Sequence, residues 1–296
     1  VPLWRALAKS YNLATVNLGL QLGIDRVADM LGTLGAVRDI DVLPAMLLGS
    51  VSLPPVEVAQ VYQTMAAGGF RAPLRTIREV LDASGRPLTR YPLAVQPVVS
   101  ADAAYLTQWA MRKVVEQGTA TWLKQRLPAG LTVAGKTGTT NDMRDSWFAG
   151  FSGDRVAVVW VGRDDNKPMG LSGSSGALRV WGDIMASIEN QPLNDMPPEE
   201  IVMASACGSS MPFSRGHTGT GVSCGPARAP ASRKVTETPE ASSPSSTGAS
   251  SGTVQARTQP SSSRNAPSAS SGVVARAGDA ASASERSIHT AAMREE

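Results

Sequence analysis

The sequence of 296 residues has few aromatic side chains, and its carboxyl-terminal part has none. Aromatic residues make up 5% of the chain, and the last of them is Phe213. Serine accounts for 15 of the 56 residues from 241 to 296. A segment of this composition buries too little apolar surface to offset its chain entropy, so we expect residues 231–296 to form a disordered tail.

Long apolar runs and a local excess of positive charge are also missing. The longest uninterrupted apolar run is Val156–Val161, whereas a membrane-spanning helix needs about 20 apolar residues. Residues 1–200 contain 19 basic and 19 acidic side chains, so the net charge of +3 comes from the remainder. This balance argues against a nucleic-acid partner. The chain begins with Val1 and has no apolar leader, so we expect it to be a piece of a longer protein whose anchor is absent.

The hydrophobic pattern changes from helical to strand-like along the chain. Apolar side chains at helical spacing predict helices just after Ser10, from Asp25 to Leu34, from Pro54 to Gly68, from Ser100 to Gly118 and from Leu178 to Ile188. Residues rich in Thr, Val, Trp and Phe predict three sequential antiparallel strands at Thr132–Thr140, Ser146–Phe151 and Arg155–Val161. Helices followed by a meander and a covering helix indicate an α+β fold, with the compact region ending near Pro192–Pro198.

The stretch Lys136-Thr137-Gly138-Thr139-Thr140 is the most informative local feature. Two glycines, Gly135 and Gly138, flank the lysine inside a strand pattern, which suits the close approach of another backbone or of a ligand. A fixed ammonium beside hydroxyls and an accessible strand edge would bind an anionic, peptide-like ligand. An exposed edge strand whose lysine discourages aggregation is the alternative, and it is the commoner explanation for the pentapeptide alone.

The second feature is Ser10-Tyr11-Asn12. A hydroxyl and a carboxamide two positions apart offer a proton relay and a two-way amide hydrogen bond. Taken alone, the pair is more often a helix cap.

Together the two features resemble a family of penicillin-interacting serine enzymes, in which Ser-x-x-Lys, Ser-x-Asn and Lys-Thr-Gly occur in this order. The last two motifs are present here as Ser10-Tyr11-Asn12 and Lys136-Thr137-Gly138. The surrounding segments 16–19, 44–49, 57–60, 145–150 and 160–164 also look like the transpeptidase domain of class A penicillin-binding proteins, in particular the bifunctional 1B type. The resemblance covers roughly residues 1–200. It implies a penicilloyl serine transferase/β-lactamase-like fold, an antiparallel sheet flanked by helices, truncated at the amino terminus.

The resemblance also implies an activity and a set of roles. A serine would attack the penultimate D-Ala carbonyl of a peptidoglycan stem peptide, and β-lactams would enter the same route. Ser10 would relay protons, Asn12 would hold the substrate amide, and Lys136 would polarise Ser10 and attract the terminal carboxylate. Thr137, Gly138, Thr139 and Thr140 would bind the substrate, with the backbone N–H of Thr139 forming half of an oxyanion hole. No cofactor is expected, and the location would be the periplasmic side of the inner membrane.

The nucleophile itself is not in the sequence. None of the six lysines has a serine three positions before it, so the chain contains no Ser-x-x-Lys, and the resemblance places that motif upstream of Val1. Alternating side-chain directions present a second difficulty, because Lys136 and Gly138 fall on one face of a strand and Thr137 and Thr139 on the other. Both sets can serve one cleft only if this strand is a sheet edge.

Cys207 and Cys224 are the only cysteines and lie in a segment, residues 201–230, that we interpret as an extension of the domain. For an exported protein a disulfide between them is favoured, and two free thiols are the alternative. A metal site is not expected, since His217 is the only nearby partner. Two further functions stay open: a β-lactamase or β-lactam sensor of the same fold, and a non-catalytic fragment with a binding role, its tail tethered to cell-wall partners.

Overall fold

The computed structural model describes residues 1–206, 208–217 and 271–276. The amino-terminal part is helical, with α1 (Leu3–Lys9), α2 (Asn12–Leu22), α3 (Ile24–Leu34), the 3-10 turn η1 (Pro44–Leu48) and α4 (Pro55–Ala66). The predicted helices after Ser10, near 25–34 and near 54–68 are therefore confirmed. The helix α3 begins one residue before the predicted start at Asp25, and its N-cap is Gly23.

Short strands and two helices follow. They are β1 (Phe70–Arg71), β2 (Glu79–Leu81), β3 (Pro87–Arg90), β4 (Gln96–Pro97), α5 (Ala101–Gln117) and α6 (Leu123–Arg126). The strands β2 and β3 pair as an antiparallel hairpin with exposed residues throughout, and β1 pairs with β4. The helix α5 agrees with the predicted segment 100–118, ending at Gly118.

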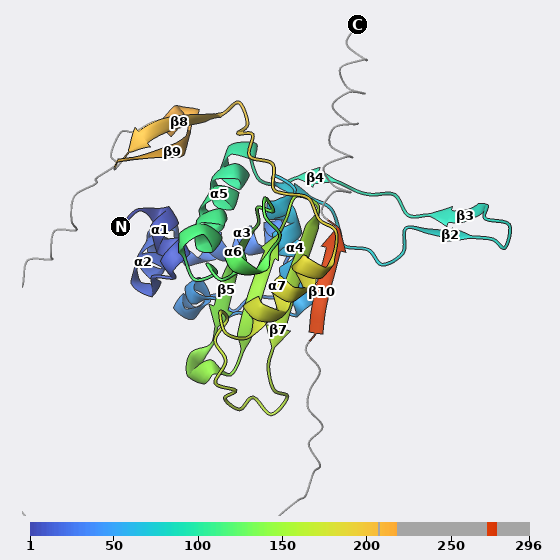
Figure 1. Cartoon of the computed structure of the whole chain (residues 1–296), viewed down its shortest axis with the longest axis horizontal. Coiled ribbons are helices and arrows are strands. Elements are labelled where there is room, and N and C mark those ends of the chain that lie inside the picture. The colour runs from blue at the N-terminus through green and yellow to red at the C-terminus, as the bar shows by residue number, and fades with distance from the viewer. Residues whose placement is uncertain (207, 218–270, 277–296) are drawn as a thin grey trace, which may run out of the picture. The chain divides into compact units, whose positions relative to one another are not determined.

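The central sheet contains the three predicted strands, β5 (Ala134–Thr139), β6 (Ser146–Phe151) and β7 (Arg155–Val161), with the short turn η2 (Asn141–Met143) after β5. The pairing is antiparallel and sequential, and the strand order is β10-β7-β6-β5, so β5 is an edge strand (Figure 1). The helix α7 (Ala177–Ser187) follows, as the spacing of Leu178, Trp181 and Met185 predicts.

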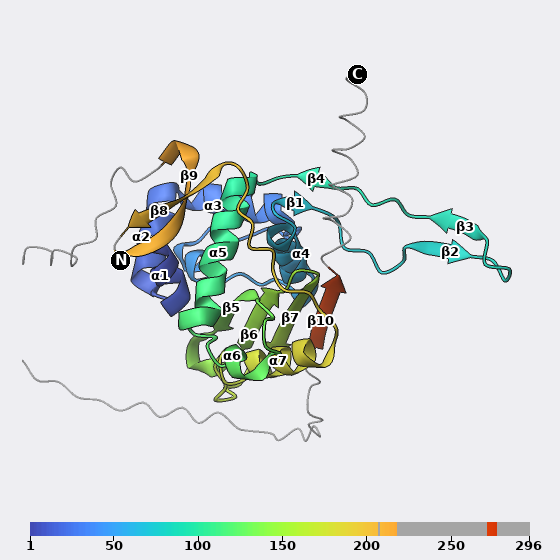
Figure 2. The ribbon, with the colours of Figure 1, turned by 45° about the horizontal axis from the view of Figure 1, so that its top comes forward.

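Each face of the sheet packs against helices (Figure 2). On one face Phe148 and Val159 pack with Trp181 of α7, and the rings of Phe148 and Trp181 meet edge to face with centroids 4.9 Å apart. On the other face Ala149 and Val158 pack against Ala59 of α4. Full burial of these side chains fixes the register, since a one-residue slip would turn them to the opposite face.

The folded part extends beyond the segment rich in proline. A hairpin of β8 (Ile201–Ala206) and β9 (Ser209–Ser214) follows, ending in the turn η3 (Arg215–His217). It contacts α5 and buries Ile201 and Met211. Paired structure therefore continues past Pro198, where we expected the compact region to end, and the hairpin packs on α5 through β9.

Within the expected tail, residues 231–296, the structure describes only one short segment. Residues 271–276 form β10 (Ser271–Arg276), which pairs with β7 along the whole strand. Composition did not indicate this strand, because its two valines lie in a segment dominated by serine and alanine. The Cys207–Cys224 disulfide and the rest of the tail lie outside the described residues. Within the described part, no helix has the length and apolarity to cross a membrane.

Candidate active site

Ser10 occupies the turn between α1 and α2. Its backbone is in the left-handed region, at φ 54° and ψ 49°, which is uncommon for a residue other than glycine. The N–H of Ser10 donates to Leu7 O at 3.2 Å, and the N–H of Tyr11 donates to Ala6 O at 2.9 Å, so the turn closes the carboxyl end of α1. Ser10 therefore does not cap the amino end of α2, whose N-cap is Tyr11 without a side-chain hydrogen bond; its backbone instead ends α1.

The Ser10 hydroxyl instead accepts a hydrogen bond from Lys136 Nζ, across 126 positions of sequence. The same ammonium donates to Thr137 O at 2.9 Å. Thr137 Oγ1 lies 2.7 Å from Thr119 Oγ1, and either hydroxyl can be the donor. The structure therefore brings together the two sequence features at one place. A lysine that merely discouraged aggregation would extend into solvent, whereas this ammonium is bound by protein oxygens.

Burial changes the charge behaviour of this lysine. Loss of hydration lowers the pKa of Lys136 from 10.5 to about 8, because burial disfavours the charged ammonium. No ion pair involving Lys136 is present within residues 1–206 and 208–217. Its acceptors are neutral oxygens. An ammonium held in this way is suited to an incoming carboxylate, which would supply the missing countercharge.

A close contact between α1 and the end of α5 holds Ser10 in place. The N–H of Thr119 donates to Ala8 O at 3.1 Å, and Lys9 Nζ donates to Gln117 O at 2.5 Å. Between them, a Cβ at Gly118 would lie 2.2 Å from Ala8 O. Only glycine allows this approach, so Gly118 is required for the position of α1 rather than only for ending α5.

The edge position of β5 resolves the difficulty of its two faces. Thr140 N donates to Asp145 O, at 3.2 Å, on the side of β6. Backbone groups alternate along a strand, so the N–H and C=O of Thr139 and of Thr137 point away from β6. Lys136 reaches round this edge to bind Thr137 O. The free backbone edge of β5 therefore lies between the face that carries Lys136 and the face that carries Thr137 and Thr139. Residues from both faces can serve one cleft at this edge.

The threonines that follow have different surroundings. Thr139 Oγ1 accepts a hydrogen bond from the N–H of Gly173 at 2.8 Å, and its hydroxyl proton has no recorded acceptor among the described side chains and carbonyls. Thr140 Oγ1 donates to Asp145 Oδ2 at 2.9 Å and accepts from Asp145 N at 2.8 Å. The hydroxyl proton of Thr140 is thus already used in the turn before β6.

The other two predicted site residues are Asn12, whose side chain is exposed, and Gly138, which is packed against a tryptophan. Asn12 is exposed at the first turn of α2, two positions after Ser10, and its side chain makes no hydrogen bond recorded with the described residues. Gly138 pairs with Trp147 across β5 and β6, and a Cβ on Gly138 would lie 3.0 Å from the Cβ of Trp147. Packing of the tryptophan is therefore one structural reason for this glycine.

Comparison with known proteins decides the family. The model of the penicillin binding protein transpeptidase domain matches residues 1–186. The chain belongs to this transpeptidase family. Penicillin-binding protein 1B of Vibrio cholerae is 50% identical over 186 residues, covering 62% of this chain and 24% of the relative. Penicillin-binding protein 1B of Escherichia coli is 46% identical over 197 residues, covering 66% and 23%. The chain thus spans about a quarter of the length of these curated relatives.

Solved structures show the same fold. Penicillin-binding protein 1A from Haemophilus influenzae superposes with a TM-score of 0.66 at 24% identity, over 73% of this chain and 40% of that one. PonA1 from Mycobacterium tuberculosis, in complex with penicillin V, gives a TM-score of 0.57 at 22% identity, over 66% of this chain and 58% of that one. The predicted α+β penicillin-binding fold and the resemblance to 1B-type proteins are confirmed.

The local sequence patterns did not indicate three residues that support this candidate site. Thr119 contacts the Thr137 hydroxyl, Gly118 permits the approach of α1, and Gly173 binds Thr139. A Cβ on Gly173 would lie 2.4 Å from Gly138 O, so its backbone packs directly on β5. The run of small residues at 173–176 was the available signal for this contact, since such runs often mark a close backbone approach.

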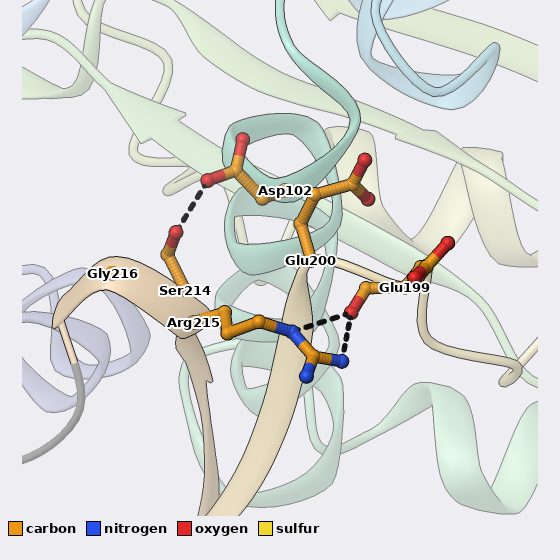
Figure 3. A pocket seen from close by; sticks show the side chains of 6 residues that line it. All are labelled: Asp102, Glu199, Glu200, Ser214, Arg215 and Gly216. Atoms are coloured by element: carbon orange, nitrogen blue, oxygen red, sulfur yellow. Dashed lines mark hydrogen bonds between the residues drawn. The ribbon is translucent and has the colours of Figure 1, made fainter.

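A separate hollow of about 420 Å³ lies between the first turn of α5 and the β8–β9 hairpin (Figure 3). Ser100 Oγ donates to Asp102 Oδ1 at 2.6 Å, and Ser214 Oγ donates to Asp102 Oδ2 at 2.7 Å. Both hydrogen bonds stabilise the carboxylate and lower the pKa of Asp102. Arg215 donates to Glu199 O at 2.8 Å. None of the predicted site residues Ser10, Asn12 and 136–140 lines this hollow, so it is separate from the candidate site. In the part of the chain that the structure describes, no three His, Cys, Asp or Glu residues are grouped to hold a metal ion.

Proposed function

We propose that this chain supplies the Ser-x-Asn and Lys-Thr-Gly parts of a D,D-transpeptidase site that cross-links peptidoglycan stem peptides. The observation that carries the proposal is the hydrogen bond from Lys136 Nζ to Ser10 Oγ, between motifs 126 positions apart. Membership of the transpeptidase family supports the reaction type. The proposed ligands are stem peptides ending in D-Ala-D-Ala and the β-lactams that imitate them.

The chemistry would proceed through an acyl-enzyme. A serine of a Ser-x-x-Lys motif, which this chain does not contain, attacks the penultimate D-Ala carbonyl, and the Thr139 N–H donates to the developing oxyanion. The bond to the terminal D-Ala breaks, and Ser10 passes the serine proton to the leaving amine. An amine of a neighbouring stem peptide then attacks the ester carbonyl, forms the cross-link and regenerates the serine hydroxyl.

The remaining residues would hold the substrate. Lys136 provides the positive charge for the terminal carboxylate, and the hydroxyls of Thr137 and Thr139 donate to it. Asn12 holds the substrate amide, since its carboxamide is exposed and can accept and donate at once. Thr140 acts indirectly, because its hydroxyl supports the turn through Asp145. We place the reaction on the periplasmic side of the inner membrane.

Covalent labelling by a fluorescent penicillin tests the proposal. The reagent would be applied to the isolated chain and to a chimera in which the part of the Vibrio cholerae relative preceding its matched 186 residues is joined to Val1. We expect label on the chimera and none on the isolated chain. Lys136→Met in the chimera should reduce the labelling rate at least about 100-fold, as for other groups that bind charge in the transition state.

Lys124→Met is the matched control, because Lys124 is exposed on α6 and should leave the labelling rate unchanged. Label on the isolated chain would refute the assignment of the nucleophile to another segment. Equal labelling of the chimera and of its Lys136→Met variant would refute the role of the Lys-Thr-Gly strand. Steady release of the label as hydrolysed product would instead support the β-lactamase alternative.

A further inference from the structure

The Thr137 hydroxyl meets a second hydroxyl that comes from outside the Lys-Thr-Gly strand. Thr119 follows the carboxyl end of α5, and its Oγ1 lies 2.7 Å from Thr137 Oγ1, which is the usual distance for a hydrogen bond between hydroxyls. Both residues are partly buried. Since each oxygen can be the donor or the acceptor, the distance alone leaves the direction of this hydrogen bond open.

The backbone of Thr119 is held without help from its hydroxyl. The N–H of Thr119 donates to Ala8 O at 3.1 Å, and the N–H of the next residue, Ala120, donates to Val114 O at 3.1 Å. Ala120 is fully buried. These contacts fix the turn after α5 through main-chain groups and packing. The hydroxyl of Thr119 therefore acts on Thr137 rather than on the local structure of the turn.

The ammonium of Lys136 constrains the Thr137 hydroxyl. Lys136 Nζ lies 3.5 Å from Thr137 Oγ1, and an ammonium can only donate. Its positive charge favours an orientation in which the Thr137 oxygen faces the ammonium and the hydroxyl proton points away. The proton can then reach Thr119 or a ligand at the edge of β5. A carboxylate is the stronger acceptor of the two, since hydrogen bonds to an ionised group are about twice as strong as neutral ones.

Thr139 shows the effect of a fixed donor at the same edge. Its Oγ1 accepts from the N–H of Gly173 at 2.8 Å, and a backbone N–H can only donate. The hydroxyl proton of Thr139 is thus directed away from Gly173 whether or not a ligand is bound. Thr137 has a partner that can reverse its role, because a hydroxyl donates or accepts by rotation about its C–O bond. The two substrate-binding hydroxyls therefore differ in how their protons are directed.

We propose that Thr119 is a positioning residue, whose hydroxyl accepts from Thr137 in the free site and donates to Thr137 when a carboxylate binds. The reversal frees the Thr137 proton for the carboxylate and keeps a donor behind the Thr137 oxygen. Only the two O–H bonds rotate, so no proton changes its oxygen atom. A chain of hydrogen bonds in one direction also polarises each member, which strengthens the bond to the ligand. The inference rests on the proposed transpeptidase function, in which Thr137 binds the terminal carboxylate.

Acylation of the chimera by two forms of one reagent tests this role. The variant Thr119→Val keeps the size of the side chain and removes the hydroxyl. We expect it to lower the second-order rate constant for a fluorescent penicillin about 10-fold, as for the loss of one partly buried hydrogen bond. The methyl ester of the same penicillin has no carboxylate, so its rate should be the same in the variant and in the unmodified chimera. An equal fall for the acid and the ester would overturn the proposal, because it would show a purely structural role.

Two further variants serve as controls. Thr119→Ser retains the hydroxyl and should restore most of the acylation rate, and a rate as low as that of Thr119→Val would overturn the proposal. Thr107→Val is the matched control, because Thr107 is exposed on α5 and its hydroxyl donates to Ala103 O at 2.8 Å within the helix. Thr107→Val should leave the rate unchanged. A fall as large as that of Thr119→Val would overturn the proposal, because it would show that the contact with Thr137 is not the cause.

A double-mutant cycle with Thr137→Val tests whether the effect passes through Thr137. Where the Thr137 hydroxyl is already absent, Thr119→Val should cause no further fall in the acylation rate. A further fall of the same size would overturn the proposal. An unmodified chimera that takes no label would refute the proposed function and this inference with it. A labelled chimera whose Thr119→Val variant reacts equally fast would refute this inference alone.

Discussion

Replacing Gly118 by alanine should separate α1 from α5 and move Ser10 away from Lys136. The new Cβ would lie 2.2 Å from Ala8 O and 2.7 Å from the Cα and O of Val114. Both neighbours are fully buried, so neither can move into free space. Overpacking of this kind costs about 1–3 kcal/mol, and loss of the hydrogen bond from Thr119 N to Ala8 O costs about 1 kcal/mol more.

We therefore expect Gly118→Ala to lower the free energy of unfolding by about 2–4 kcal/mol. In a domain of this size that corresponds to a fall of roughly 5–15 °C in the melting temperature. Urea and thermal unfolding followed by circular dichroism measure the change. Gly32→Ala is the matched control, because a Cβ there meets nothing within 4 Å and lies in α3. That control should stabilise the chain by up to about 1 kcal/mol. A Gly118→Ala protein as stable as the wild type would refute the reasoning.

Three further predictions test the site and its support. Between pH 8 and 10.5 the free energy of unfolding should rise by about 3 kcal/mol, because the native state releases the Lys136 proton while the unfolded state still holds it. Lys136→Met should abolish this rise. A variant whose stability changes with pH as the wild type does would contradict the assignment to Lys136. Thr139→Val should cost about 1–3 kcal/mol by leaving Gly173 N–H without its acceptor, whereas Thr139→Ser should restore stability in the same urea titration. Phe148→Ala should cost about 3–5 kcal/mol beneath Trp181, and a loss below 1 kcal/mol would show that the ring is not packed as described.

Local patterns predicted the elements of the site but not how they meet. The spacing of Leu178, Trp181 and Met185 reflects burial of one helix face, and such periodicity is visible in any sequence that folds this way. The strand pattern from Thr132 to Val161 was equally clear. These signals are local, so they indicate the type of each element without its partners.

The contacts of Ser10 could not be derived from its neighbours in sequence. Considered locally, a serine two positions before an asparagine is most often a cap, and only the packing of α1 on α5 brings it to Lys136. The packing depends on Gly118, whose role is steric exclusion of a side chain. A glycine at a helix end is usually explained by termination of the helix, so the sequence alone does not indicate this steric requirement.

The carboxyl-terminal segments illustrate a different limit. Composition favoured a disordered tail over residues 231–296 and an extension before it, and it gave no sign of two short paired segments, the β8–β9 hairpin and β10. The six residues of β10 acquire their structure from the available edge of β7, which is far away in the sequence. A long-range partner of this kind leaves little trace in local composition.

The central claim is that Lys136 of β5 and Ser10 of the α1–α2 turn share one half-buried site. The most direct measurement is an NMR titration of the six lysine side chains, with the Lys136 signal assigned by its loss in Lys136→Arg. The account predicts a pKa of about 8 for Lys136 in the wild type. Ser10→Ala should lower it further, because the hydroxyl stabilises the ammonium. A value near 10.5 that Ser10→Ala leaves unchanged would contradict the account.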